Sequence, residues 1–384
     1  MASALRGGRV YQHNAFGITA DCTLCEVQPF GASLCSGTLK GAATQTKVYL
    51  MRVQTAIKVA GKTRPYNTIN RTDTKGFDIK SNLKSKISNL KSINMSHKII
   101  AELFSNRVGI LATMHQKERV MAPILSRELG IQVLVPENFD TDRFGTFTRD
   151  IKRAGSQLEA ARFKAMAAME VTGEAIAFAS EGTFGPHPFV PGLALNREIV
   201  IFIDQKHDIE IIGHSACLET NFNSKTVKNV DEAYAFAKLV GFPEHGLVVM
   251  VNKSSENQPQ IIKGIVSEEQ LIEVVTLALS QSKDGKVHIE TDMRAHYNPT
   301  RMKNIEKATL DLIGKVNQIC PDCSWPGFDL VDRKIGLPCG VCGFPTEMTL
   351  AVVYQCKKCG FAEEKLFPDG IEMADPSRCY YCNP

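Results

Sequence analysis

Four pairs of cysteines near the C-terminal end constrain the fold of this chain more than any other feature. Each pair has the spacing C-x-x-C, and the members are Cys320 and Cys323, Cys339 and Cys342, Cys356 and Cys359, and Cys379 and Cys382. Two-residue spacing lets a tight turn direct both sulfurs toward one ion, and two such turns complete the tetrahedral Cys₄ site that Zn²⁺ accepts. The sequence therefore predicts two structural zinc ions in a double zinc-ribbon domain, residues 318–384.

The pairing of the four turns is open between two arrangements. Consecutive ribbons would join the first pair to the second and the third to the fourth, across 15 and 19 residues. A nested arrangement would instead join the two middle pairs and the two outer pairs. We expect the consecutive arrangement. A disulfide scaffold is the alternative to zinc, but the N-terminus lacks the basic and apolar regions of a secretion signal, so we expect a cytoplasmic protein with reduced thiols.

Charge is divided unevenly along the chain. Residues 1–94 hold 14 lysines and arginines against 4 acidic residues, and with +4 overall the remaining residues carry −6. An acidic body does not favour general nucleic-acid binding. The sequence contains no apolar run of 18 residues, so we also expect no membrane span.

The first 94 residues differ in pattern from the rest. They have no sustained helical or strand period, and they end in a repeat in which SNLKS recurs after seven residues. We expect this segment to be disordered, or not to be part of the native protein, with translation starting at Met95.

Residues 95–317 have the pattern of an α/β domain. An apolar run at 108–112, an amphipathic segment at 118–129 and a second apolar run at 131–135 predict a strand, a helix and a parallel strand. Alternating runs at 199–203 and 209–212 predict an antiparallel hairpin. The predicted fold is a mixed, largely parallel sheet with flanking helices, followed by the small zinc-ribbon region.

Polar residues follow several of these predicted strands. The stretch FASEGTFGPHP, residues 178–188, indicates a buried strand that ends at Glu181. The carboxyl end of such a strand is where α/β folds usually place their ligand. Lys117 lies in the loop after the first strand, where phosphate is often bound.

Two further candidates have both a structural and a functional interpretation. Ser156 and Glu159 form a capping box that would start a helix, and Glu159 could instead bind a metal ion. Arg294 and Arg301 lie beside the predicted helix start at Asn298-Pro299, where a bound anion would offset the helix dipole. The alternative is that Glu290 and Asp292 pair with these arginines.

The chain from about residue 108 to residue 384 resembles an uncharacterised bacterial family that joins an α/β domain to a cysteine-rich tail. The motifs that carry the resemblance are GILATMHQKE, DTDRFGTF, ASEGTFGPHP, TDMRAHYNPTRM and CYYCNP. This resemblance supplies no activity.

Residues 108–205 also resemble the inosine triphosphate pyrophosphatase and Maf superfamily. The similar segments are the strand GILAT with its lysine-containing loop, the helix SQLEAARFKAMAAMEVTG and the following SEG. His115 departs from the usual asparagine, and Lys117 comes one residue early. The resemblance implies a Mg²⁺-dependent hydrolase of nucleotide phosphoanhydride bonds. It implies catalytic or metal-binding roles for Glu181, Glu159, Lys117 and either Asp140 or Asp142. It implies phosphate binding by Thr113 and Lys164, and by Arg301 if the resemblance includes the helix from residue 298. Arg294 is a phosphate-binding candidate from its place beside that helix start.

A non-catalytic zinc-ribbon adaptor is the alternative function. In that case the α/β domain would bind a small anion or another protein, and the ribbons could contact a protein partner. If the protein is instead a hydrolase, the expected ligand is a small phosphate compound or a nucleotide.

Overall fold

The computed structural model describes residues 95–145, 155–251 and 260–384. The expectations for residues 1–94 fall outside the described residues. The described chain begins with a helical segment, residues 95–104, which places Ile100 and Phe104 in the core. Among the described residues, no helix is both long enough and apolar enough to cross a membrane.

The larger sheet has five strands in the order β2-β1-β3-β4-β5. Its strands are β1 (Val108–Ala112), β2 (Gln132–Leu134), β3 (Ile176–Pro186), β4 (Ala194–Asp204) and β5 (Ile209–Cys217). The predicted strand-helix-strand unit is present, with α3 (Glu118–Leu129) between β1 and β2, and β1 pairs in parallel with both β2 and β3. The predicted hairpin is β4–β5, which pairs antiparallel.

The expectation of a largely parallel sheet is wrong. β3 pairs antiparallel with β4, so only β2, β1 and β3 run in the same direction, and every other strand ladder of the described chain is antiparallel. The physical reason is connection length. Parallel neighbours need a crossover of a dozen or more residues, whereas the loop 187–193 between β3 and β4 is too short for one.

The expected end of the strand at Glu181 is also wrong. β3 continues for five more residues, and its ladder with β4 runs unbroken from Ile176 to Pro186. The glycines and the proline that suggested a loop lie in the part of β3 that continues past its pairing with β1 and still pairs with β4. Glu181 therefore lies in the middle of β3.

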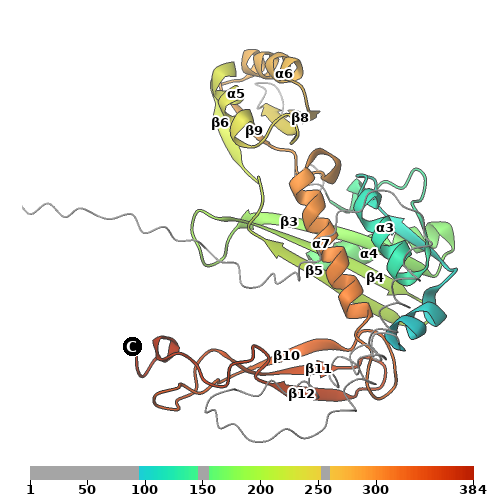
Figure 1. Cartoon of the computed structure of the whole chain (residues 1–384). Helices are drawn as coiled ribbons and strands as arrows, with labels where there is room; N and C mark the ends of the chain where they lie inside the picture. The colour runs from blue at the N-terminus through green and yellow to red at the C-terminus, as the bar shows by residue number, and fades with distance from the viewer. Residues whose placement is uncertain (1–94, 146–154, 252–259) are drawn as a thin grey trace, which may run out of the picture. The chain divides into compact units, whose positions relative to one another are not determined.

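Helices cover both faces of this sheet because successive side chains of a strand point to opposite faces. α3 and α7 (Pro299–Val316) pack with Phe178, Val200 and Phe202 on one face. α4 (Gln157–Thr172) packs on the other face, against the neighbouring alanines and isoleucines of β3 and β4. Figure 1 shows α7 crossing the strands of this sheet.

α7 approaches β5 closely at one glycine. A Cβ atom on Gly213 would lie 2.2 Å from the carbonyl oxygen of Ala308 and 2.5 Å from the amide nitrogen of Leu312. Only glycine allows this contact without a shift of the helix. The position of α7 matters because its first turn carries Arg301.

A second sheet lies between β5 and α7 in the sequence, in the order β6-β9-β7-β8. Its strands are β6 (Ser224–Val227), β7 (Leu247–Val251), β8 (Gln260–Ile265) and β9 (Val287–Thr291). α5 (Val230–Leu239) and α6 (Glu268–Gln281) pack on it around a core of their own. The C-terminal region has a third sheet, β10 (Asp329–Ile335), β11 (Thr349–Gln355) and β12 (Ala362–Leu366), with β11 in the centre.

Candidate functional site

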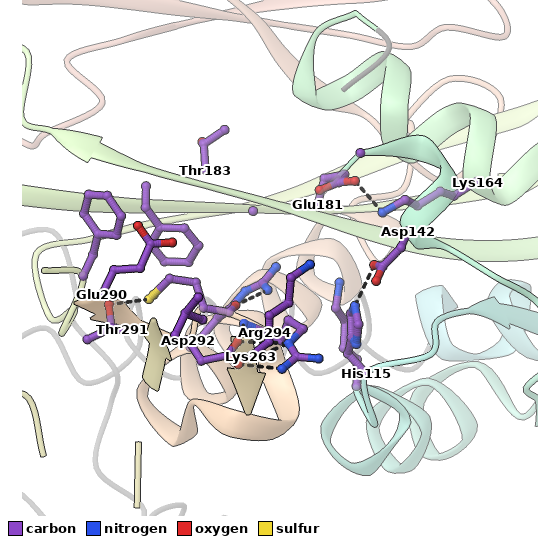
Figure 2. Close-up of a pocket in the computed structure, with 18 residues that line it drawn as sticks. His115, Asp142, Lys164, Glu181, Thr183, Lys263, Glu290, Thr291, Asp292 and Arg294 are labelled. Carbon is purple, nitrogen blue, oxygen red and sulfur yellow. Dashed lines mark hydrogen bonds and ion pairs between the residues drawn. The ribbon is translucent and has the colours of Figure 1, made fainter. Parts of the chain in front are cut away.

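A pocket of about 280 Å³ lies where β3, the loops around α3, the first turn of α7 and the second sheet meet. Figure 2 shows its lining side chains. The charged or titratable ones are His115, Lys117, Asp142, Lys164, Glu181, Lys263, Glu290, Asp292, Arg294 and Arg301. Phe184, Phe222, Val248 and Met293 supply an apolar part. The pocket thus combines five cationic side chains, four carboxylates and a hydrophobic wall.

Arg301 is the most deeply buried of the pocket's cations, with 1% of its surface exposed. Its Nε donates to Oε1 of Glu198 at 2.9 Å, and its Nη1 donates to the carbonyl oxygen of Met293. Asn298, the N-cap of α7, accepts the backbone N–H of Arg301. A buried charge needs a partner and hydrogen bonds to be tolerated, and Glu198 is that partner. These contacts fix the guanidinium at the pocket wall.

Lys164 of α4 reaches the pocket from the opposite helix layer. Its Nζ lies 2.5 Å from Oε1 of Glu181, and both side chains are less than a tenth exposed. A dashed line in Figure 2 marks the contact between these two side chains. Glu181 of β3 therefore orients the buried ammonium group of Lys164.

Lys117 follows the loop after β1, and it is 5% exposed. Its Nζ donates to Oγ of Ser180 at 2.9 Å and to the carbonyl oxygen of Ser180 at 3.2 Å. Burial lowers the pKa of Lys117 to about 7, and repulsion from Arg301 and Lys164 adds to the effect. Lys117 is therefore a cation that can lose its proton near neutral pH.

His115 and Asp142 form a hydrogen-bonded pair at the same rim. Nε2 of His115 lies 3.0 Å from Oδ1 of Asp142, as the dashed line in Figure 2 marks. Burial lowers the pKa of His115 despite this hydrogen bond, and the bond itself lowers the pKa of Asp142. The ring of His296 stacks on that of His115 with centroids 5.2 Å apart. The pair is thus a neutral imidazole oriented by a carboxylate.

The second sheet contributes the remaining charges. Asp292, at the end of β9, accepts hydrogen bonds from Nε and Nη2 of Arg294, the latter at 2.7 Å. Asp292 also accepts the backbone N–H of Gly264, next to Lys263 on β8. On the apolar side, Phe184 of β3 stacks on Phe222 with centroids 5.8 Å apart. Residues far apart in the sequence therefore form one wall.

The cysteines form two tetrads. Cys320, Cys323, Cys356 and Cys359 make the first, and Cys339, Cys342, Cys379 and Cys382 make the second, with all sulfurs of a tetrad within 4.8 Å of one another. Each tetrad can bind one zinc ion, since four thiolates at this spacing suit tetrahedral coordination. They are the groups of metal-binding side chains found among the described residues.

The pairing of the turns is interleaved, so both arrangements considered from the sequence are wrong. The first pair joins the third, and the second joins the fourth. The reason is the antiparallel pairing of β10 with β11, in which Asp329 lies opposite Gln355. This hairpin brings the Cys320–Cys323 turn, before β10, next to the Cys356–Cys359 turn, after β11. The second C-x-x-C turn lies at the other end of the hairpin, where it pairs with the last turn of the chain.

Residues 164–384 match the family described as domain of unknown function DUF6671. The chain belongs to this family. The expectation of an uncharacterised family with a cysteine-rich tail is thereby confirmed. The matched DUF6671 region contains both tetrads, Lys164, Glu181, Arg294 and Arg301, and it begins after His115 and Lys117.

No curated protein matches the chain. The resemblance to the inosine triphosphate pyrophosphatase and Maf superfamily therefore has no support from these comparisons. The roles that it implied must be judged from the contacts in the pocket.

Six of the eight residues proposed for catalysis or phosphate binding line the pocket. These are Lys117, Asp142, Lys164, Glu181, Arg294 and Arg301. Their individual roles stay predictions.

Glu159 and Thr113 are not among the lining residues. Glu159 Oε2 accepts the backbone N–H of Ser156 at 2.7 Å, which completes the capping box at the start of α4. This bond lowers the pKa of Glu159. Thr113 is buried and accepts the backbone N–H of His115 through Oγ1, so it shapes the loop that carries His115 and Lys117.

A resident Mg²⁺ does not fit the carboxylates of this pocket. Glu181, Asp142, Asp292 and Glu290 each contact a cationic or imidazole side chain of the protein. Glu159 lies outside the pocket and caps its helix. Mg²⁺ prefers carboxylate oxygens and water in octahedral geometry, so it would first have to displace these pairs. The acidic side chains of the pocket thus already have lysine, arginine or histidine partners within the protein.

Sequence reasoning did not select four residues that matter to the pocket: His115, Glu198, Lys263 and Phe222. His115 could have been selected from the sequence, because it lies in the same loop as Lys117. Glu198 comes directly before the apolar run 199–203 of β4, and a carboxylate in such a position must pair when it is buried. Lys263 and Phe222 depend on the fold of the second sheet, which the sequence pattern did not predict.

Proposed function

We propose that the protein is a hydrolase that acts on a phosphoanhydride or phosphate-ester bond of a small molecule, such as a nucleotide. The observation that carries this proposal is the convergence of Arg301, Lys164 and Lys263 on one pocket that also holds the His115–Asp142 pair. Cations fixed in a site with little water stabilise the charge that develops on a transferring phosphoryl group. A neutral histidine beside them can activate water.

The hydrolytic step uses only groups of this chain. When Nε2–H of His115 donates to Asp142, Nδ1 keeps a lone pair that can accept a proton from water. The water oxygen then forms a bond to phosphorus, and the bond to the leaving oxygen breaks. A phosphoanhydride leaving group departs as an anion, which Arg301 and Lys164 stabilise, and the proton on His115 passes to solvent.

The apolar wall supports a substrate with more than a phosphate group. Phe184, Phe222 and Val248 line the same pocket as the cations. A planar, weakly polar group could pack on the two stacked phenylalanine rings. This combination favours a nucleotide over inorganic polyphosphate.

The test is a hydrolysis assay with purified full-length protein, with and without added Mg²⁺. Phosphate and pyrophosphate release are measured for ITP, XTP, dUTP, ATP and GTP. We expect at least one nucleotide to be hydrolysed, and His115→Gln to lower kcat by about 100-fold or more. Glu159→Gln, which lies outside the pocket, serves as the matched control and should retain activity. Absence of hydrolysis across the panel, or an unchanged rate in His115→Gln, would contradict the proposal.

A binding protein without catalytic activity is the second candidate. It is favoured by the exposed apolar side chains around the second tetrad, where Val341, Tyr380 and Tyr381 are each more than 70% exposed. Solvent-exposed aromatic residues on a rigid metal-bound turn are suited to a protein interface. Saturable nucleotide binding without turnover, in a correctly folded protein, would favour this candidate over the hydrolase.

A further inference from the structure

Lys117 differs chemically from the other cations of the pocket. The guanidinium of an arginine does not deprotonate in proteins, whereas the amine of a buried lysine can. Lys117 is 5% exposed, and the ammonium of Lys164 and the guanidinium of Arg301 line the same pocket. Its Nζ is held by Ser180 rather than by a carboxylate. Burial and the two nearby cations favour the neutral form of this amine, and the carboxylates of Glu181 and Glu198 oppose them more weakly.

A neutral lysine is a nucleophile, whereas an ammonium is not. Burial, together with repulsion from Arg301 and Lys164, lowers the pKa of Lys117 to about 7. About half of such a group is unprotonated at pH 7, compared with fewer than about one in a thousand ordinary lysines. The same two cations that suppress its charge can bind an anionic group of a ligand. The pocket therefore places a reactive amine beside an anion-binding wall.

We propose that Lys117 is a covalent attachment site, whose amine forms an imine with a small aldehyde or ketone that carries an anionic group. In this step the Nζ lone pair forms a bond to the carbonyl carbon, and the carbonyl oxygen takes up a proton to give a carbinolamine. Loss of that oxygen as water gives the imine. The overall change joins an amine and a carbonyl compound with release of one water, and it needs no oxidant or reductant.

This site does not depend on the hydrolase proposal. Hydrolysis requires His115 as a base, whereas imine formation requires only an unprotonated Lys117 and an anion bound near it. The two chemistries therefore fail or succeed separately.

The experiment traps the imine with borohydride. Full-length protein is incubated at pH 7 with pyridoxal 5′-phosphate, reduced with sodium borohydride, and digested for peptide mass spectrometry. We expect Lys117 to be labelled at least about tenfold faster than Lys98 or Lys283, two surface lysines that lie away from the pocket. Pyridoxal, which lacks the phosphate group, should label Lys117 more slowly, and excess inorganic phosphate should protect it.

A pH series and the variant Lys117→Met serve as controls for the labelling of Lys117. The ratio of Lys117 to surface labelling should fall as the pH is raised toward 10, because ordinary lysines then also become neutral. Lys117→Met should lose the extra label while keeping the circular dichroism spectrum of the parent protein. Labelling of Lys117 at the same rate as the surface lysines would overturn the proposal. Equal labelling by pyridoxal and its phosphate would overturn the anionic part of it.

Discussion

Single residues of the pocket depend on one another through charge. Arg301 and Glu198 are both almost fully buried, and burial of either charge without the other would destabilise the fold. Lys164 and Glu181 form a second such pair on the opposite side. Lys117 lies near both pairs, and burial, with added repulsion from Arg301 and Lys164, lowers its pKa. The charge state of each of these residues therefore depends on the charges of the others.

The titration of Lys117 predicts how stability changes with pH. Its pKa is about 7 in the folded protein against 10.5 as the reference, so between these values the unfolded chain binds a proton that the folded chain does not. The free energy of unfolding should therefore rise with pH in this window. From pH 7 to pH 9 the parent protein should gain at least about 1 kcal/mol relative to Lys117→Met. Urea unfolding at both values measures this, and parallel curves would show that Lys117 is an ordinary lysine.

Gly182 allows Glu198 and Arg301 to meet beneath β3. A Cβ atom at this position would lie 2.4 Å from Oε1 of Glu198 and 2.8 Å from Nη2 of Arg301. Gly182→Ala should therefore displace the pair, destabilise the protein by about 1–3 kcal/mol and weaken nucleotide binding. Gly185→Ala is the matched control on the same strand, because a Cβ there meets no atom within 4 Å. Equal stability and equal affinity in the two variants would contradict this role.

At the scale of elements, the β10–β11 hairpin decides which cysteines share an ion. Interleaving makes a specific prediction for double variants, measured as zinc per chain by mass spectrometry. Cys320→Ser with Cys356→Ser should leave about one zinc ion, since both residues belong to the first tetrad. Cys320→Ser with Cys339→Ser should remove both ions. Consecutive ribbons would give the opposite result for the two double variants.

Elements with local signals were predictable from the sequence. The capping box at Ser156, the Asn298-Pro299 helix start and the apolar runs of β1 and β2 each depend on neighbouring residues alone. The C-x-x-C spacing likewise identified all eight cysteines of the tetrads.

Long-range pairing was not predictable from such signals. The interleaving of the tetrads follows from the register of β10 on β11, and the antiparallel β3–β4 ribbon depends on pairing that continues past Glu181. Glu159 shows a related limit. Its sequence position fits a cap and a ligand equally well, and only the bond to Ser156 decides between them.

At the scale of the whole molecule, α7 connects the pocket to the first tetrad. Arg301 lies in its first turn, and Cys320 follows soon after its last residue, Val316. Ile319 and Trp325, next to the first tetrad, pack against the main core. Phe344 and Tyr381 of the second tetrad instead contact each other. The two metal sites should therefore differ in their effect on the rest of the fold.

Loss of one metal site at a time tests this difference. Cys320→Ser should lower the melting temperature of the main core, because the turn that carries Trp325 would lose its metal. Cys339→Ser should affect that transition less. Thermal unfolding followed by circular dichroism, with zinc content measured on the same samples, compares the two. A larger effect of Cys339→Ser would contradict the proposed connection through α7.

The most direct test of the central claim is calorimetric titration of the full-length protein with tripolyphosphate. We expect saturable binding of one tripolyphosphate per chain, because Arg301, Lys164 and Lys263 line a single pocket. The double variant Lys164→Met with Glu181→Gln removes one ion pair as a unit, and it should bind at least about tenfold more weakly while remaining folded. No saturable heat in the parent protein, or the same affinity in the double variant, would contradict the assignment of this pocket to phosphate.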